Sequence, residues 1–291
     1  MSYQSIQEIL DRCETENINF FEAILHEDCN DRGVTREDSM HMMQGMWRAM
    51  VESTNNYERD LRSKSGLVGG EGGLMEDYRQ NGNPLCGDFV SKVMMRALQM
   101  GGNNACMKRI VAAPTAGACG VLPAVLTTYF DLHEVEEEKI VEALYVAAGV
   151  GQVIAARAFI AGAAGGCQAE IGSASSMAAA ALVYLRGGSK EQISYASGIA
   201  LKNLLGLVCD PVGGLVEVPC VKRNVIGAMN ALSSADMSLA GITSAIPTDQ
   251  VIDAMRAVGE CMDVSLRETG KGGLAATPRA KEIVSQLGWM K

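Results

Sequence analysis

The sequence predicts an all-α protein, a single helical domain whose glycine-rich loops gather at helix ends. Apolar residues recur at the three- and four-residue spacing of amphipathic helices, and no segment has a convincing strand pattern. Aromatic residues make up only 5% of the 291-residue chain, and Ala, Gly and Met are abundant, which favours helices packed through small side chains. The length permits one large domain or two intimate ones. Because neither a linker nor an internal repeat is visible, we expect one domain over residues 1–291.

The N-terminal helices are predicted from their caps and apolar stripes. Ser5 and Glu8 are typical of a capping box, and the residues on one face after it are Ile6, Ile9, Leu10 and Cys13. Thr35 and Asp38 open a second helix, whose stripe toward Tyr57 contains Met40, Met43, Trp47, Met50 and Val51. Methionine adapts to irregular contacts, so this stripe indicates core or a partner interface. Residues from about 1 to 62 are therefore a candidate docking region.

Glycine and proline punctuate the rest of the chain. The sequence GLVGGEGG, from Gly66 to Gly73, interrupts the helical pattern and predicts a loop that allows close backbone approach. Asn83 and Pro84 predict a helix start, and Gly101 with Gly102 predicts its end. Later helices are expected at 121–130, 136–160, 168–186, 189–208, 221–238, 248–266 and 278–287. The junctions between them are short and rich in Gly, Pro or Thr: PTAGACG, AGAAGGC, CDPVGG and ETGKGGLAATP.

Charge and cysteine usage exclude several classes of function. The formal net charge of -9 gives no electrostatic reason to bind nucleic acid or an anionic membrane. The first twelve residues are not those of a secretory signal, which predicts a cytoplasmic protein. The most apolar stretch, residues 141–166, contains Glu142, Gln152 and Arg157, so a buried core helix is expected there rather than a membrane span. Nine cysteines without a secretory signal indicate reduced thiols or metal ligands.

Three cysteines, Cys167, Cys209 and Cys220, occur at predicted loop-to-helix junctions rather than in apolar stripes. A thiolate near a helix start is stabilised by free backbone N–H groups, as a metal ligand requires. Their wide spacing fits neither a zinc ribbon nor a ferredoxin motif, so spacing alone leaves ordinary buried thiols as the alternative. Buried thiols are also the interpretation for Cys13, Cys29, Cys106 and Cys261, whereas Cys86 and Cys119 occur in loop-like contexts and stay undecided between the two.

Long ordered motifs then carry a resemblance. The segments SGLVGGEGG, APTAGACGVLPAVL, GCQAEIGSASSMAAAAL, CDPVGGLVEVPCVKRN and TGKGGLA, spanning Ser65 to Ala275, resemble the alpha chain of iron-sulfur-dependent L-serine dehydratase. The resemblance implies a lyase (L-serine ammonia-lyase) that converts L-serine to pyruvate and ammonia, in serine catabolism that feeds gluconeogenesis. It also implies an oxygen-labile [4Fe-4S] cluster held by Cys167, Cys209 and Cys220. Three protein ligands leave one iron uncovered, which would act as a Lewis acid on the serine hydroxyl.

Candidate substrate and catalytic residues lie in the glycine-rich loops. Turn N–H groups, hydroxyls and a guanidinium suit a zwitterion, so the expected substrate-binding residues are Ser65, Thr115, Ala116, Gly117 and Arg223. The expected catalytic candidates are Lys64, Glu71 and Lys271. The three histidines, His26, His41 and His133, are in segments that resemble polar helix faces and are disfavoured as the base. A base supplied by another chain stays open.

The resemblance covers only the catalytic half of the family's architecture. Single-chain members also carry an α+β domain that has no counterpart in these motifs, which implies a separate beta chain and a hetero-oligomer. Some relatives end in a cysteine able to cap the free iron, whereas no cysteine follows Cys261 in this sequence. Self-capping by the C-terminus is therefore not expected.

Three alternatives compete with this interpretation. A pyridoxal-phosphate lyase would use Lys64 or Lys271 for a Schiff base, but would leave the junction cysteines unexplained. A non-enzymatic helical module would hold zinc or an electron-transfer cluster through four ligands. A related hydro-lyase would apply the same uncovered-iron chemistry to a different hydroxy acid.

Overall fold

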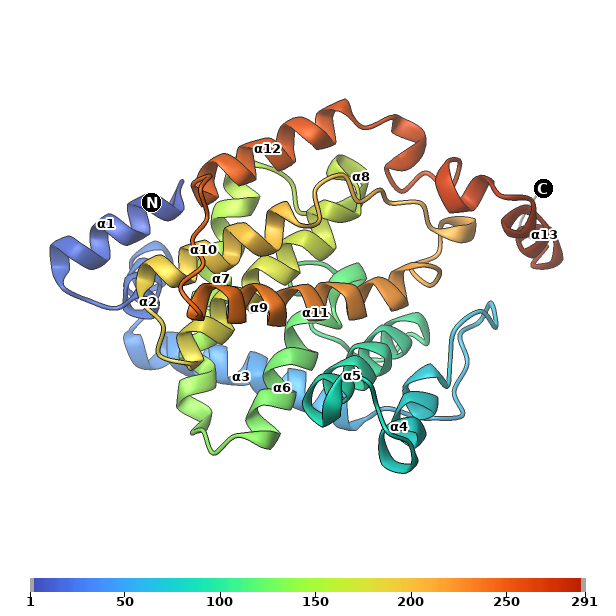
Figure 1. Ribbon diagram of the computed structural model, residues 1–291, viewed down its shortest axis with the longest axis horizontal. Coiled ribbons are helices and arrows are strands. Elements are labelled where there is room, and N and C mark those ends of the chain that lie inside the picture. The colour runs from blue at the N-terminus through green and yellow to red at the C-terminus, as the bar shows by residue number, and fades with distance from the viewer. Residues whose placement is uncertain (1–2, 289–291) are drawn as a thin grey trace.

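A computed structural model describes residues 3–288, and within that range the chain folds into α-helices joined by short 3-10 turns and loops, with one isolated bridge between Cys209 and Arg267 in place of strands (Figure 1). The all-α prediction is confirmed for these residues. The first helices are α1 (Ile6–Glu16), α2 (Phe20–Arg32), α3 (Arg36–Asn55), α4 (Glu71–Asn81), α5 (Gly87–Ala105), α6 (Val121–Leu132) and α7 (Glu137–Arg157). The remaining helices are α8 (Gly162–Gly165), α9 (Ser173–Leu185), α10 (Lys190–Lys202), α11 (Cys220–Leu239), α12 (Thr248–Cys261) and α13 (Pro278–Gln286).

Helix α9 is the centre of the fold. Its sequence, SASSMAAAALVYL, is buried on every side except at its last residue, and it contacts α6, α7, α10 and α11. A helix that is apolar all round is buried all round, and its alanines let the neighbouring backbones come close. The outer layer consists of α2 and α3 over α7, α5 beside α11 with α4 packed on α5, and α1 and α12 beside α10. In Figure 1 α13 lies at the opposite side of the molecule from α1.

Side-chain caps fix several helix starts where the sequence places them. Thr35 Oγ1 accepts a hydrogen bond from the Asp38 backbone N at 3.1 Å, which confirms the predicted start of α3. Ser5 Oγ likewise accepts from the Glu8 backbone N at 3.0 Å and confirms the start of α1. A capping box also needs the Glu8 carboxylate to accept from the Ser5 backbone N. That part of the prediction is wrong, because the carboxylate accepts from the backbone N of Gln4 instead.

The predicted bounds of α5 are wrong at both ends. The helix begins at Gly87, after the Asn83–Pro84 pair, and continues through Gly101 and Gly102 to Ala105. A Cβ on Gly101 would lie 3.0 Å from Val221 Cγ1, so this glycine serves the close packing of α5 against α11 and does not end the helix. Sequence patterns cannot distinguish these two uses of glycine, because the partner helix lies far along the chain.

Three helices, α2, α4 and the single-turn α8, were not predicted. Helix α4 starts at Glu71, inside the segment predicted as a loop, so that Gly72 and Gly73 are helical. Their backbones lie against neighbouring side chains, since a Cβ on Gly72 would be 2.5 Å from Gln99 Cγ and one on Gly73 would be 2.7 Å from Arg59 Cγ. Helix α2 is capped by a box of Asn19 and Glu22 with a weakly one-sided apolar pattern, which explains why periodicity missed it.

Helices α10 and α12 end earlier than predicted, because the residues expected to form their last turns contact other parts of the chain instead. Helix α10 stops at Lys202, and the backbone beyond it turns toward the buried Gln168, whose side-chain Oε1 accepts from Gly206 N at 2.9 Å. Helix α12 stops at Cys261 and is followed by a 3-10 turn, Val264–Leu266. The segment expected as one helix over 168–186 starts with a π-helical turn, Gln168–Gly172 (η2), before α9. These departures all lie at the loops that approach the three candidate cysteines.

Helix α7 is long and apolar enough to cross a membrane by length and composition. In the fold, 67% of its apolar window is buried against other helices, as expected for a core helix.

Candidate functional site

Three loops bring Cys167, Cys209 and Cys220 to one end of the α9–α11 pair. Cys167 immediately precedes the π-helical turn, and Cys220 is the first residue of α11, as the sequence predicted for thiols at helix starts. All three side chains are buried, with 2%, 3% and 7% of their surface exposed. Gln168 links the segment after Cys167 to α12, because its Nε2 donates a hydrogen bond to the Met255 carbonyl at 3.1 Å.

The expected helix-start position is wrong for Cys209. This residue lies in extended backbone, where its N–H donates to the Leu266 carbonyl at 2.8 Å and its carbonyl accepts from the Glu268 N–H at 2.7 Å. The thiol is therefore positioned by pairing with a distant segment, and that pairing also brings Glu268 to the site. No local sequence pattern predicts a bridge between two segments so far apart in the chain.

The three thiols influence one another electrostatically and are all strongly desolvated. Burial raises the pKa of Cys167 and of Cys220 to about 12, and raises that of Cys209 still further, with Cys167 and Glu170 adding to the rise. Burying such groups as thiolates requires a compensating positive charge, which a bound metal centre supplies. A set of three buried sulfur donors fits a soft metal centre such as an iron-sulfur cluster.

The described donor side chains do not form a site for a single metal ion. Across residues 3–288, no three Cys, His, Asp or Glu side chains come close enough to hold one metal ion. A zinc site needs its ligands within bonding distance of one atom. The described residues therefore provide no ready-made zinc site.

Glu170 is one of the side chains at this site that sequence reasoning missed. Its Oε1 accepts from Thr115 Oγ1 at 2.7 Å, and its Oε2 lies 4.0 Å from Cys209 Sγ. Burial raises the pKa of the Glu170 carboxyl, the Thr115 hydrogen bond lowers it, and nearby Glu268 raises it again. The available signal was its position three residues after Cys167 in GCQAEIG.

Arg223, expected to bind substrate, lies at the site and makes structural contacts. Its Nη1 donates to the Val208 carbonyl at 2.7 Å, and its Nη2 forms a 2.8 Å ion pair with Asp210 Oδ1. The guanidinium also acts on Cys167, whose pKa it lowers against the larger effect of burial. Substrate binding by Arg223 thus stays a prediction, and the contacts described are those of a residue that positions two thiol-bearing segments.

The loop with Thr115, Ala116 and Gly117 lies directly against Glu170, as a Cβ on Gly117 would be 2.9 Å from Glu170 Oε1. Asn224 of α11 fixes this loop, because its Nδ2 donates to the Gly117 carbonyl at 2.9 Å. The predicted substrate loop and the thiol loops therefore share one site. Substrate binding by this loop stays a prediction.

The Gly-rich segment before α4 docks next to the Cys220 loop. Ser65 donates a hydrogen bond to the buried carboxylate of Glu217, three residues before Cys220. Glu71 accepts from the Gly69 N–H at 2.7 Å. The remaining two catalytic candidates, Lys64 and Lys271, are exposed. The structure thus joins Ser65 to the site through Glu217, whereas the roles predicted for these residues stay predictions.

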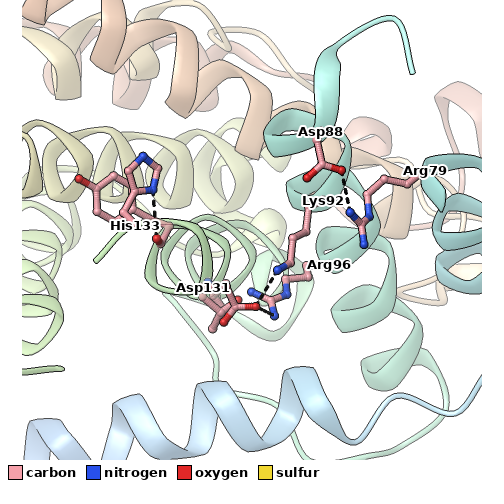
Figure 2. Close-up of polar contacts among 9 residues, drawn as sticks. Arg79, Asp88, Lys92, Arg96, Asp131 and His133 are labelled. Carbon is pink, nitrogen blue, oxygen red and sulfur yellow. Dashed lines mark hydrogen bonds and ion pairs between the residues drawn. The ribbon is translucent and has the colours of Figure 1, made fainter. Parts of the chain in front are cut away.

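None of the three histidines lies on an element that carries one of the three thiols. His26 and His41 are on α2 and α3, whereas His133 follows the far end of α6, where its Nδ1 lies 3.2 Å from the Tyr129 carbonyl oxygen (Figure 2). Since α6 begins beside Asn224 and rises ~1.5 Å per residue, His133 lies most of a helix length away from the site. A pocket of about 460 Å³ lies in that region, between α5, α6, α9 and α11.

Comparison with known proteins shows which family the chain resembles along its length. Residues 15–275 match the family described as serine dehydratase alpha chain. The "Probable L-serine dehydratase, alpha chain" of Bacillus subtilis (strain 168) is 42% identical over 98% of this chain and 95% of its own length. The "L-serine dehydratase, alpha chain" of Peptoniphilus asaccharolyticus is 40% identical over 95% of each chain. The longer "L-serine dehydratase" of Mycobacterium bovis (strain ATCC BAA-935 / AF2122/97) is 36% identical over 94% of this chain and 61% of that protein.

Proposed function

Because this chain belongs to the serine dehydratase alpha chain family, we propose that it is the cluster-bearing subunit of a cytoplasmic L-serine dehydratase, which converts L-serine to pyruvate and ammonia. The observation that carries the proposal is the convergence of three buried thiols, from Cys167, Cys209 and Cys220, within a chain that its relatives match over almost its whole length.

Cys167, Cys209 and Cys220 would hold a [4Fe-4S] cluster. Their burial and the Arg223 guanidinium next to Cys167 support this assignment. When bound, the cluster would supply one iron without a thiolate, a Lewis acid for the β-hydroxyl of serine.

The protein's own residues would hold the amino acid and move its α-proton. The loop from Thr115 to Gly117, with Ser65 and Arg223, would bind the substrate, and Lys64, Glu71 or Lys271 would act as the base unless the partner chain provides it. Loss of the α-proton and of the β-hydroxyl, as water, leaves aminoacrylate. Aminoacrylate tautomerises to an imine, which water hydrolyses to pyruvate and ammonia.

The partner would be a separate beta chain, in a hetero-oligomer. Two relatives of matching length are called alpha chains, and a longer relative named L-serine dehydratase extends well beyond the region matched here. The N-terminal helices over about residues 1–62 would form the docking region, of which residues 1–2 lie outside the described range. Helix α3 supports this placement, because Met42 and Met46 leave 52% and 46% of their surfaces exposed.

Anaerobic reconstitution tests the function directly. The chain is loaded with iron and sulfide, mixed with its beta chain and assayed for pyruvate formation from L-serine. We expect a broad visible absorption that bleaches in air, and serine-dependent pyruvate only in the loaded, anaerobic complex. Pyruvate formation by the iron-free complex, or a sharp aldimine band in place of the broad one, would contradict the proposal.

A further inference from the structure

Two carboxylates converge on one point beside Cys209. That point is Gly162 of α8, where an added methyl group would lie 2.8 Å from Glu170 Oε2, 3.2 Å from Glu268 Oε2 and 2.9 Å from Cys209 Sγ. Glu170 comes from the π-helical turn and Glu268 from the loop that pairs with Cys209. The two acids are therefore brought together by separate parts of the chain, and both face the same thiol.

Neither carboxylate has a cationic partner within residues 3–288. The Arg223 guanidinium is engaged by Asp210 at 2.8 Å, and the Glu170 side chain accepts a hydrogen bond from the neutral Thr115 hydroxyl. Two partly buried carboxylates beside each other are unfavourable unless a positive group joins them. The two carboxylates and the space between them therefore suit a cationic group of a substrate.

Small residues keep that space clear. Gly117 and Gly162 lie on two sides of the Glu170 carboxylate, and a Cβ at either position would come within 2.9 Å of its oxygens. Neither glycine has a positive φ, so the backbone alone does not require glycine at either position. The requirement is for space around the carboxylate.

We propose that Glu170, assisted by Glu268, binds the ammonium group of the amino-acid substrate and thereby selects amino acids over hydroxy acids that lack it. This inference rests on the proposed function. In serine the ammonium and the hydroxyl are on adjacent carbons, so a group that binds the ammonium must lie next to the metal ligands. Glu170 satisfies this requirement, because its Oε2 is 4.0 Å from Cys209 Sγ.

The test uses the iron-loaded complex with its beta chain under anaerobic conditions. The variants are Glu170→Gln, which keeps the shape and removes the charge, and Glu170→Asp, which keeps the charge. A matched control is Glu142→Gln on α7, another mostly buried carboxylate, which bonds Tyr184 at 2.6 Å far from the thiols. The measurements are iron content, kcat and KM for L-serine, and the inhibition constant of 3-hydroxypropanoate, which is serine without its ammonium group.

We expect Glu170→Gln to raise the KM for L-serine at least about tenfold, the effect of losing a charged hydrogen bond, with iron content and the inhibition constant of 3-hydroxypropanoate unchanged. Glu170→Asp should recover part of the loss, and Glu142→Gln should behave as the wild type. A parallel rise in both constants, an unchanged KM, or loss of iron from Glu170→Gln would overturn the inference. If the wild-type complex makes no pyruvate, the proposed function fails first and the inference fails with it.

Discussion

Arg223 of α11 and Asp210 of the Cys209 loop form a nearly buried ion pair of 2.8 Å, with 12% and 4% of their side-chain surfaces exposed. The second Asp210 oxygen accepts from the Leu274 N–H at 2.8 Å. Gly273 makes this approach possible, because a Cβ there would lie 2.4 Å from Asp210 Oδ2. One aspartate thus joins α11, the Cys209 loop and the C-terminal glycine-rich loop.

Replacing Arg223 by Ala should destabilise the iron-free chain by about 3–5 kcal/mol, because Asp210 would be left buried without its partner. Urea unfolding of the two proteins measures this difference. Arg279→Ala is the control, since its pair with Glu282 is exposed by 72% and 61% and should contribute less than about 1 kcal/mol. Equal effects of the two substitutions would mean that the buried pair does not hold these loops.

Replacing Cys209 by Ala should abolish the visible absorption and the pyruvate formation of the reconstituted complex, since two thiols cannot replace three at the cluster. Iron analysis, the absorption spectrum and the pyruvate assay measure the effect. Cys261→Ala is the matched control, because that thiol is exposed at the end of α12 and should be dispensable. Retention of iron and activity by Cys209→Ala would remove this residue from the ligand set.

The helices that could be predicted are those whose signals are local. Thr35 caps α3 as its sequence indicates, and Ser189 with Gln192 caps α10 at the predicted start. Glycine was misread where its role depends on distant residues. Gly101 was predicted to end a helix, whereas it lies inside α5 against Val221.

The residues of the candidate site also divide into those indicated by local signals and those positioned by distant contacts. Cys167 and Cys220 are at helix starts that a sequence can indicate, whereas the position of Cys209 depends on its bridge to Arg267. Glu170 was missed because its importance comes from Thr115 and Cys209, which only the fold brings to it. Long-range pairing therefore sets the limit of what the motifs could reveal.

High pH should destabilise the chain partly through Cys119. Complete burial raises the pKa of its thiol from 9.0 to about 12, so the folded state holds this proton more tightly than the unfolded state. The stability that the neutral thiol contributes is full below pH 9.0 and is lost as the pH rises toward about 12. The free energy of unfolding should fall by up to about 1.4 kcal/mol per pH unit from this group.

Cys119→Ala isolates this contribution from that of the other thiols. The difference in unfolding free energy between wild type and variant should be constant from about pH 7 to about pH 8.5 and should shift in favour of the variant above about pH 9. Urea unfolding of the iron-free proteins across that range measures it. A difference that does not change with pH would show that the Cys119 thiol titrates alike in both states.

Gly162→Ala should damage the site more than the fold. The added methyl group would lie 2.8 Å from Glu170 Oε2 and 2.9 Å from Cys209 Sγ, so these side chains must move apart, at a cost of about 1–3 kcal/mol. We expect reduced iron content and a higher KM for L-serine in the reconstituted complex. Gly45→Ala on α3 is the control, because nothing lies within 4 Å of its added methyl group and alanine favours the helix. Because both variants add the same methyl group, a defect in Gly162→Ala alone would locate the functional space between Glu170 and Cys209, whereas normal iron content and KM would show that this space is not used.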